Sequence, residues 1–266
     1  VFFVFVASTV LSAKSIYSVL DYGAKGDGKT NDTKAIQATI DTATAKGGGV
    51  VLFPAGKYVS GTIVLKDYVV LRLETGSILQ GSLNLKDYPV DFGEYRIAPP
   101  YVWYAPLIYA DNARYIGIEG NGIIDGRGTR KNFPPFPREN QRPGLIRFKD
   151  CKYVDVKNVT MRNPACWTFH LLNCEDVVVR DIRLNSNANR NNDGIDVDGG
   201  KRILITGCNI NSEDDAIVLK SFKRETISDI VISDCILTST CSALKIGTET
   251  VGNFENIAIS NCTIYG

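Results

Sequence analysis

One short pattern recurs along the second half of this chain and limits the folds open to it. Each copy begins with two apolar residues that are two positions apart, followed by a polar residue and then an Asn, Asp or Gly. It ends with an apolar residue or Cys and, two positions later, another apolar residue. Successive copies start 23, 26, 27 and 27 residues apart, at Val154, Val177, Ile203, Ile230 and Ile257. Weaker copies lie upstream, at 116–123 and 69–73.

This pattern predicts stacked coils of short strands. Apolar residues two apart on a strand face the same side. The Asn, Asp or Gly that follows favours a tight bend, after which the next apolar residues begin a strand on another face. A single coil cannot bury its interior, whereas stacked coils share a continuous core. The sequence therefore predicts an all-β fold, a parallel β-helix.

Two other folds also contain periodic short strands, namely leucine-rich repeats and the two-sheet sandwich. Leucine-rich repeats would show a tighter period with fixed Leu positions, which are absent here. A two-sheet sandwich also contains periodic short strands, but the repeat stays in phase, which favours the solenoid. Cys208, Cys235 and Cys262 share one repeat position, 27 residues apart each time, and we interpret them as a column of small apolar side chains in the core.

The N-terminal part carries a helical pattern. Asp32 is a plausible N-cap for a helix over 34–43, in which Ala35, Ile36 and Ile40 share one face, and the glycines 47–49 end it. A solenoid needs its open end covered. We therefore expect this amphipathic α-helix to cap the N-terminal end of the β-helix.

The remaining segments fit a secreted protein with loops on one side. Residues 1–13 match the apolar part and small-residue end of a signal peptide, with a buried first strand as the alternative. They predict a secreted or periplasmic location. Residues 14–266 are expected to form a single catalytic β-helix domain that is incomplete at the C-terminus. The segment 88–143, rich in Pro and aromatic residues, is predicted to form long loops.

Composition narrows the possible partners. The net charge of +1 gives no global field that would attract nucleic acid or an anionic membrane. Seven cysteines cannot all pair in disulfides, and they form no C-x-x-C motif. With a single histidine in the chain as well, no zinc site is expected, and no cofactor is predicted. A monomer is expected.

Acidic residues gather between two repeats. Asp193 lies in the run Asn-Asn-Asp-Gly-Ile-Asp, and Asp214-Asp215 follow 21 residues later, close to one coil length. Because coils stack about 4.8 Å apart, these carboxylates would meet on one surface. Crowded carboxylates push their pKa values apart, as acid–base catalysis requires. Solvated turns or a Ca²⁺ site remain the alternatives.

At these residues the chain resembles the polygalacturonase family of glycoside hydrolases, the pectin-hydrolysing enzymes, in a bacterial-type form. The two acidic motifs look like that family's Asn-Thr-Asp-Gly-Ile-Asp and Asp-Asp motifs. Segments 142–146, 163–170, 21–28 and 53–56 agree as well. The resemblance covers about 19–266 and implies a right-handed parallel β-helix.

The resemblance also implies a mechanism of inverting hydrolysis without a metal. Asp214 would be the general acid that protonates the glycosidic oxygen. Asp193 and Asp215 would activate the attacking water from the opposite face. Inversion needs the acid and the base about 6.5–9.5 Å apart, which neighbouring coils can supply.

The same comparison suggests substrate-binding residues and shows two departures. Candidates are Asn191, Asp196, His170, Lys220 and Lys245; the two lysines would hold a uronate carboxylate or form structural ion pairs, and His170 is as well suited to a structural role. The family's Gly-His-Gly is missing, and Cys241 stands where its His would be. The family's Arg-Ile-Lys motif is also absent.

The sequence thus predicts an enzyme that cleaves α-linked galacturonate bonds in pectin. A rhamnogalacturonan hydrolase or an enzyme acting on chain ends is the nearest alternative. A polysaccharide lyase, which would need Ca²⁺ and a basic residue, and a non-catalytic carbohydrate-binding β-helix are further alternatives. In each case the partner is a polysaccharide.

Overall fold

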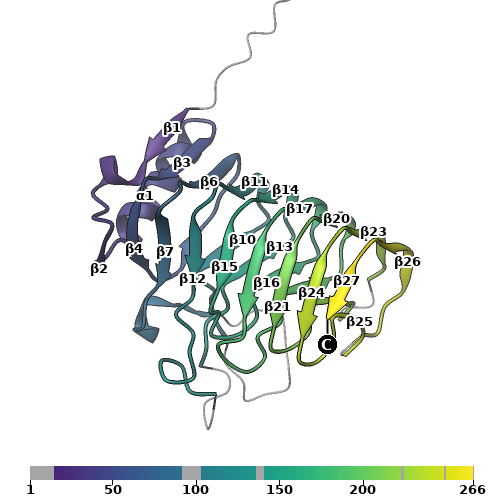
Figure 1. Ribbon diagram of the computed structural model, residues 1–266. Coiled ribbons are helices and arrows are strands. Elements are labelled where there is room, and N and C mark those ends of the chain that lie inside the picture. Colours follow the sequence, from purple (N-terminus) through teal and green to yellow (C-terminus); the bar gives the residue numbers. More distant parts are fainter. Residues whose placement is uncertain (1–14, 92–102, 136–140, 223–224, 249, 266) are drawn as a thin grey trace, which may run out of the picture.

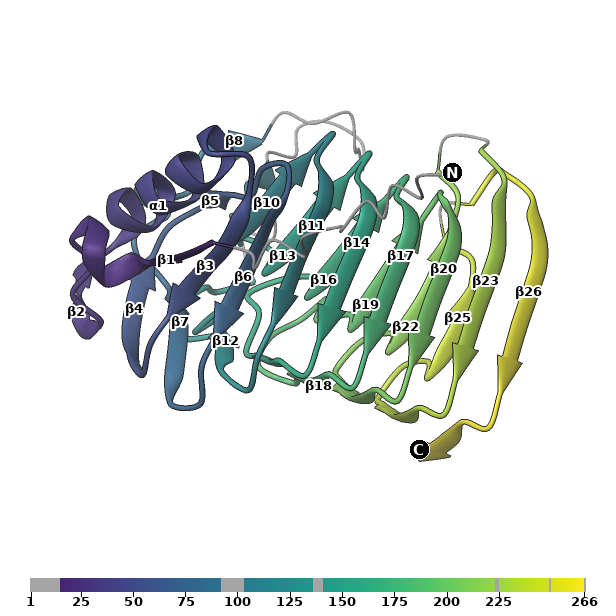
Figure 2. The same ribbon diagram turned by 90° about the horizontal axis from the view of Figure 1, so that it is seen from above.

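The computed structural model describes residues 15–91, 103–135, 141–222, 225–248 and 250–265. The predicted signal peptide, 1–13, lies outside the described residues. Three parallel sheets wind around one interior, and the chain visits them in turn in each coil (Figures 1 and 2). The predicted all-β parallel β-helix is confirmed.

The first of these sheets, sheet A, contains nine strands. They are β1 (Ile16–Ser18), β3 (Gly49–Phe53), β6 (Val69–Leu73), β11 (Arg114–Glu119), β14 (Lys152–Lys157), β17 (Glu175–Arg180), β20 (Lys201–Thr206), β23 (Ile227–Ser233) and β26 (Phe254–Ser260).

Sheet B also contains nine strands, and each comes after a strand of sheet A in the chain. They are β2 (Asp27–Asn31), β4 (Gly56–Ser60), β7 (Ser77–Gly81), β12 (Ile123–Asp125), β15 (Thr160–Arg162), β18 (Arg183–Ser186), β21 (Asn209–Ser212), β24 (Ile236–Ser239) and β27 (Thr263–Tyr265).

Sheet C contains seven strands and carries the candidate site. They are β5 (Ile63–Val64), β10 (Ile108–Asp111), β13 (Ile146–Lys149), β16 (Phe169–Leu172), β19 (Ile195–Asp198), β22 (Ile217–Lys220) and β25 (Leu244–Ile246). The short strands β8 (Val90–Asp91) and β9 (Trp103–Tyr104) pair antiparallel outside the coils.

The register of sheet A follows the sequence repeat without a shift. The five repeat starts pair in succession, Val154 with Val177, Val177 with Ile203, Ile203 with Ile230 and Ile230 with Ile257. The weaker upstream copy joins the same ladder, because Ile116 pairs with Val154. Equivalent residues of the repeat therefore lie one above another through the stack.

The bend between sheets A and B explains the turn residue of the repeat. Its five copies have φ between 54° and 64°, at Asn158, Asp181, Gly207, Asp234 and Asn261. This left-handed conformation is favourable for Gly and tolerated by Asn and Asp, whereas other residues pay a steric cost. The chain can therefore turn a sharp corner at the same point in each coil.

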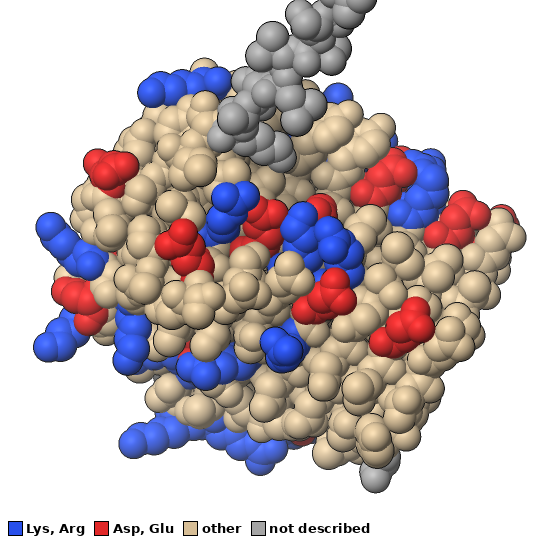
Figure 3. Space-filling model, turned by 45° about the horizontal axis from the view of Figure 1, so that its top comes forward, with Lys and Arg blue, Asp and Glu red and all other residues tan. Residues whose placement is uncertain are grey.

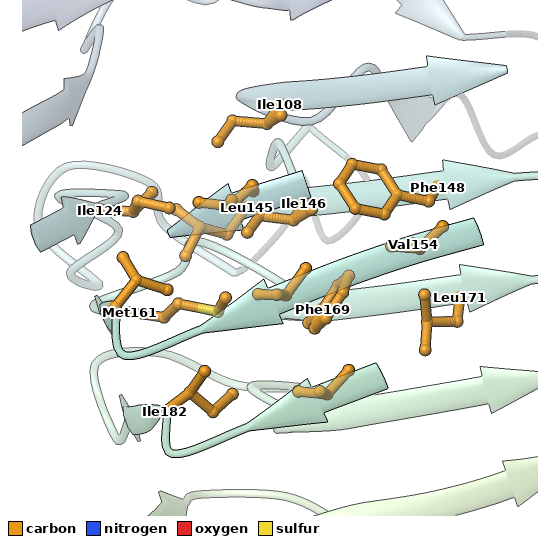
Figure 4. Packing of buried hydrophobic residues seen from close by; sticks show 14 of the residues in the cluster. Ile108, Ile124, Leu145, Ile146, Phe148, Val154, Met161, Phe169, Leu171 and Ile182 are labelled. Carbon is orange, nitrogen blue, oxygen red and sulfur yellow. The ribbon is translucent and has the colours of Figure 1, made fainter. Parts of the chain in front are cut away.

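The core consists of the inward-facing residues of all three sheets. Figure 4 shows part of it, with Phe148 and Phe169 from neighbouring coils directed into the interior. Their rings meet edge to face, 5.6 Å apart, a favourable geometry for aromatic pairs. Cys208 and Cys235 are buried at their shared position, and Cys262 is partly buried above them. The predicted cysteine column is confirmed.

The helix α1 (Thr33–Ala45) covers the N-terminal end of the stack, as predicted (Figure 2). Ile36, Ile40 and Ala43 are fully buried against the first coils. Asp32 stands at the N-cap position, but its side chain makes no capping hydrogen bond. Its carboxylate instead accepts from the backbone N–H groups of Lys25 and Gly26, at 2.7 and 3.1 Å. The Asp32 side chain therefore stabilises the preceding loop and does not cap the helix.

The prediction that 88–143 forms only loops was wrong in its central part. Strands β10, β11 and β12 make a complete coil there, with Ile108, Ile116 and Ile124 in the core. The segments before and after this coil connect sheet B to sheet C. The weaker copy of the repeat at 116–123 marks this coil in the sequence, although the Pro-rich and aromatic connections before and after it break the repeat. In the part of the chain that the structure describes, no helix is long and apolar enough to span a membrane.

The alternation along β20 can be tested with two substitutions of similar size. Ile205 is fully buried and Leu204 points outward from the same strand. We expect Ile205→Ala to lower the free energy of unfolding by about 2–5 kcal/mol, and Leu204→Ala to lower it by less than about 1 kcal/mol. Chemical denaturation measures both, and equal losses would contradict the assigned faces.

Candidate functional site

The three candidate catalytic carboxylates lie on neighbouring coils, in the turns that lead from sheet B into sheet C. Asp193 comes just before β19, and Asp214 and Asp215 come just before β22. The backbone N–H of Gly194 donates to the carbonyl of Asp215 at 2.8 Å, so the two turns stack directly. Asp193 interacts electrostatically with both later aspartates. The structure thus brings together the three residues, which we call the carboxylate cluster.

Burial sets the protonation of this cluster. Asp193 and Asp215 are almost fully buried, and Asp214 is partly exposed. Burial raises the pKa of Asp193 well above its usual range, and repulsion from Asp196, Asp214 and Asp215 adds to the rise. A neighbouring ammonium group, that of Lys220, opposes it. Asp193 therefore binds its proton more tightly than an isolated aspartate does.

The two predicted lysines have different surroundings. Lys220 Nζ lies 2.6 Å from Asp196 Oδ1 and 3.8 Å from Asp193 Oδ2. Lys245 Nζ donates to Asp215 Oδ2 at 2.8 Å. The Lys245 side chain is 29% exposed and that of Lys220 only 6%. Lys245 can therefore reach a bound substrate, whereas Lys220 is enclosed.

His170 and Asp196 lie on the outer face of sheet C, yet both are buried. The Arg147 guanidinium donates to His170 Nδ1 at 3.2 Å, and His170 Nε2 lies 3.6 Å from Asp198 Oδ2. Because Nδ1 accepts, the proton of the neutral ring sits on Nε2 and points toward Asp198. Burial, with the charge of Arg147, lowers the pKa of His170 despite Asp198.

These positions change what the predicted substrate-binding residues can do. His170, Asp196 and Lys220 lie beneath the surface, so direct substrate contact would require the side chains above them to move. Trp167 is one of these, with its ring 5.1 Å from that of His170 and 4.2 Å from Lys220 Nζ. Of the predicted set, Asn191 is exposed, and Lys245 is the accessible cation.

Arg142 is a residue whose role sequence reasoning missed. It is buried and donates to the carbonyl of Ala165 at 2.9 Å, to the carbonyl of Arg190 and to Asn191 Oδ1 at 2.8 Å. It thus joins the turns of three successive coils close to Asp193. Its signal was the Arg-Pro-Gly segment, which was recognised as part of the family resemblance without a role.

Asn192 was also overlooked, and it holds the loop from inside. It is fully buried, and its Oδ1 accepts from the backbone N–H groups of Ala188 and Asn189, at 3.2 and 2.7 Å. Its Nδ2 donates to the carbonyl of Pro164 at 3.2 Å. Asn191 and Asn192 therefore position Asp193, which follows them in the Asn-Asn-Asp-Gly run. Polar residues next to a candidate catalytic group were the available signal.

Comparison with known proteins decides the family. The family model described as Glycosyl hydrolases family 28 matches residues 51–266. The chain belongs to this family. A second model, described as Rhamnogalacturonase A/epimerase, pectate lyase-like, matches residues 16–77. The predicted polygalacturonase-like glycoside hydrolase family is confirmed.

Individual family 28 relatives agree with this assignment. The chain is 28% identical to an exo-poly-alpha-D-galacturonosidase of Dickeya chrysanthemi over 262 residues, covering 80% of this chain and 43% of that protein. It is 30% identical to a polygalacturonase of Chamaecyparis obtusa over 233 residues, covering 82% and 43%. An exopolygalacturonase structure from Thermotoga maritima aligns with a TM-score of 0.83 at 25% identity, covering 93% of this chain and 66% of that one. The chain spans less than half the length of the two relatives compared by sequence.

Cys241 is the feature that departs most from the family pattern. Its Sγ and carboxylate oxygens of Asp214 and Asp215 all lie within 4.8 Å of one another. Among the described residues, these three form the one group of His, Cys, Asp or Glu side chains close enough to share a metal ion. One member of the group, Asp215, is already paired with Lys245. The thiol thus lies at the edge of the carboxylate cluster. On the face of the molecule shown in Figure 3, acidic and basic side chains are mixed.

Cysteine labelling should report this position. Cys241 is the exposed member of the seven free cysteines, while five are buried and Cys262 is partly buried. A maleimide added to the native protein should modify Cys241 first, and modification should speed up as pH rises because burial raises the pKa of this thiol. Peptide mass analysis locates the label. Unchanged labelling in Cys241→Ser would contradict the structure.

The raised pKa of Asp193 predicts a pH-dependent gain in stability for Asp193→Asn. A carboxyl whose folded pKa lies above its unfolded value of about 3.9 costs stability once pH exceeds that value. Removing the charge should therefore raise the free energy of unfolding near about pH 7 and leave it nearly unchanged near about pH 3. Denaturant titrations at both pH values test this, with Asp181→Asn as control, because Asn occupies the same turn position in other coils.

Proposed function

We propose that this chain hydrolyses α-linked galacturonate bonds in pectin with inversion at the anomeric carbon. The observation that carries the proposal is the meeting of Asp193 with Asp214 and Asp215 on adjacent coils, in a site where burial raises the pKa of Asp193. Family 28 membership supplies the reaction class, and the names of the relatives support galacturonan as substrate.

The proposed roles follow from accessibility and coupling. Asp214, the partly exposed member, donates a proton to the glycosidic oxygen. Asp193 and Asp215 take the proton of the attacking water from the opposite side. Burial raises the pKa of Asp193, and Asp214 and Asp215 lie close enough to add to that rise. Proton transfer by positioned carboxyl groups is the chemistry that such a site can perform.

Lys245 is proposed to contact the substrate carboxylate. Its ammonium group is accessible and already lies beside the reacting carboxylates through Asp215. A uronate carboxylate could share this ammonium group by a charge-assisted hydrogen bond. Attack from a chain end is supported by the exo-acting relatives of Dickeya chrysanthemi and Thermotoga maritima. The apolar run at 1–13 supports secretion.

The test is a product analysis on defined substrates. Proton NMR during hydrolysis of polygalacturonate should show the β-anomer of the new reducing end first. A retained α-anomer would contradict inversion, and an unsaturated product would indicate a lyase. Rhamnogalacturonan is the second polysaccharide to assay, because the family model that matches residues 16–77 is described as Rhamnogalacturonase A/epimerase, pectate lyase-like. If it is cleaved faster than polygalacturonate, rhamnogalacturonan and not galacturonan is the preferred substrate.

Substitution of the carboxylates tests their roles. Asp193→Asn and Asp214→Asn should each lower kcat by about a hundredfold or more, with substrate binding retained. Asp181→Asn should keep wild-type activity, since this turn residue lies between sheets A and B. Turnover preserved in both cluster variants would show that the chemistry lies elsewhere.

A further inference from the structure

We propose that Lys220 is a positioning residue, which holds Asp193 and Asp196 in place as a charge-balanced group beneath the substrate site and does not bind substrate. This inference rests on the proposed function, since it assigns Lys220 a role in the same reaction. It replaces the expectation that Lys220 holds a uronate carboxylate.

The position of Lys220 follows from the coil register. It ends β22 and pairs with Asp198 of β19, so its side chain leaves the outer face of sheet C beside the preceding coil. From there its Nζ reaches Asp196 at 2.6 Å and Asp193 at 3.8 Å. The ring of Trp167 lies on another side, 4.2 Å from Nζ to the centroid. Two carboxylates and an aromatic face thus surround the ammonium group.

The two aspartates need this cation. Both are buried, and their negative charges repel each other. Oδ1 of Asp193 and both carboxylate oxygens of Asp196 make no well-directed hydrogen bond to any group in the described part of the chain. Buried carboxylates without hydrogen bonds are costly unless a cation compensates them. The ammonium group of Lys220 provides that compensation.

Other charged groups near Asp193 cannot replace Lys220. Lys245 is engaged by Asp215, and Arg147 donates to His170. Burial and the charge of Arg147 lower the pKa of His170. Further titratable and charged groups around the site, among the described residues, include Asp196, Asp198, Asp214, Asp215, Cys166, Cys241, Arg142 and Arg190.

The surroundings of Lys220 also argue against a substrate contact. Its side chain is 6% exposed, against 29% for Lys245. To reach a substrate, its ammonium group would have to leave two buried carboxylates unpaired, at a large cost. Lys245 can serve the substrate without that loss.

The kinetic test compares Lys220→Met with Lys157→Met. Lys157 is a matched control, because it also ends a strand and pairs with two carboxylates, Asp155 at 2.7 Å and Glu119 at 3.3 Å, but on sheet A. Without the ammonium group, Asp193 binds its proton more tightly, so the base ionises only at higher pH. Lys220→Met should therefore move the acid limb of the kcat profile to higher pH and lower kcat on that limb by about tenfold or more, with KM changed by less than about twofold. Lys157→Met should change neither.

Two further variants separate charge from packing. Lys220→Arg keeps the positive charge and should keep the acid limb near its wild-type position. Lys220→Met combined with Asp196→Asn removes one positive and one negative charge, so it should move the limb back toward that of the wild type. A tenfold rise in KM with an unmoved limb, not rescued by Asp196→Asn, would instead make Lys220 a substrate ligand and overturn the proposal.

A stability measurement decides the matter without any activity. In Lys220→Met the folded state holds protons more tightly than the wild type does, so its stability should fall further below wild type as pH rises from about 4 to about 8. A deficit that is the same at both ends would mean that Lys220 only fills space, and the proposal would fail. If the wild type hydrolyses no galacturonan, the proposed function fails, while this pH dependence still tests the role of Lys220.

Discussion

Backbone hydrogen bonds between successive coils hold equivalent residues of the repeat about 4.8 Å apart, and the rest of the structure depends on that spacing. The bonds run in register through sheet A from Ile116 to Ile257. Because register is kept, the left-handed turn residues, the buried cysteines and the core aromatics each form columns. The turns that carry Asp193 and the Asp214–Asp215 pair are stacked by the same bonds.

Sheet C turns this regular stack into a site. Its inward residues fill the core, as in the other sheets, but several of its outward residues at the centre of the sheet are both polar and buried. Arg147, His170 and Asp196 succeed one another along this outer face. Side chains from the connecting turns, such as Trp167, lie above them. Water is thereby removed from charged groups, and their interactions become stronger than they would be at an open surface.

The site also illustrates a conflict between stability and chemistry. Several buried carboxylates on adjacent coils repel one another, and the fold offsets that cost only in part, with Lys220 and Lys245. Burial, together with the repulsion that the lysines leave uncompensated, raises the pKa of Asp193. A core of apolar residues would be more stable, but it could not hold an exchangeable proton.

Sequence patterns were most informative where structure is local or repeated. The phase of the repeat predicted the stacking, and α1 was predicted from its apolar face and the glycines that follow it. Errors arose where distant partners decide. Asp32 pins the loop of Lys25 and Gly26 because those N–H groups come within reach only after the chain has turned back. The coil around Ile116 was underestimated because its neighbouring segments lack the pattern.

The sequence alone determined the β-helix, its capping helix and the gathering of Asp193, Asp214 and Asp215. The β-helix and the gathering follow from spacing along the chain and the regular rise of a coil. The capping helix follows from its apolar face and the glycines after it. The tertiary structure decided which charges pair and which remain accessible. Nothing in the sequence distinguishes Lys220 from Lys245, since both follow apolar residues in strands of the same sheet. They differ in their partners, because Lys220 lies between two carboxylates and the ring of Trp167, whereas Lys245 pairs with Asp215 on the last described strand of sheet C, and such partners are brought together only in the folded chain.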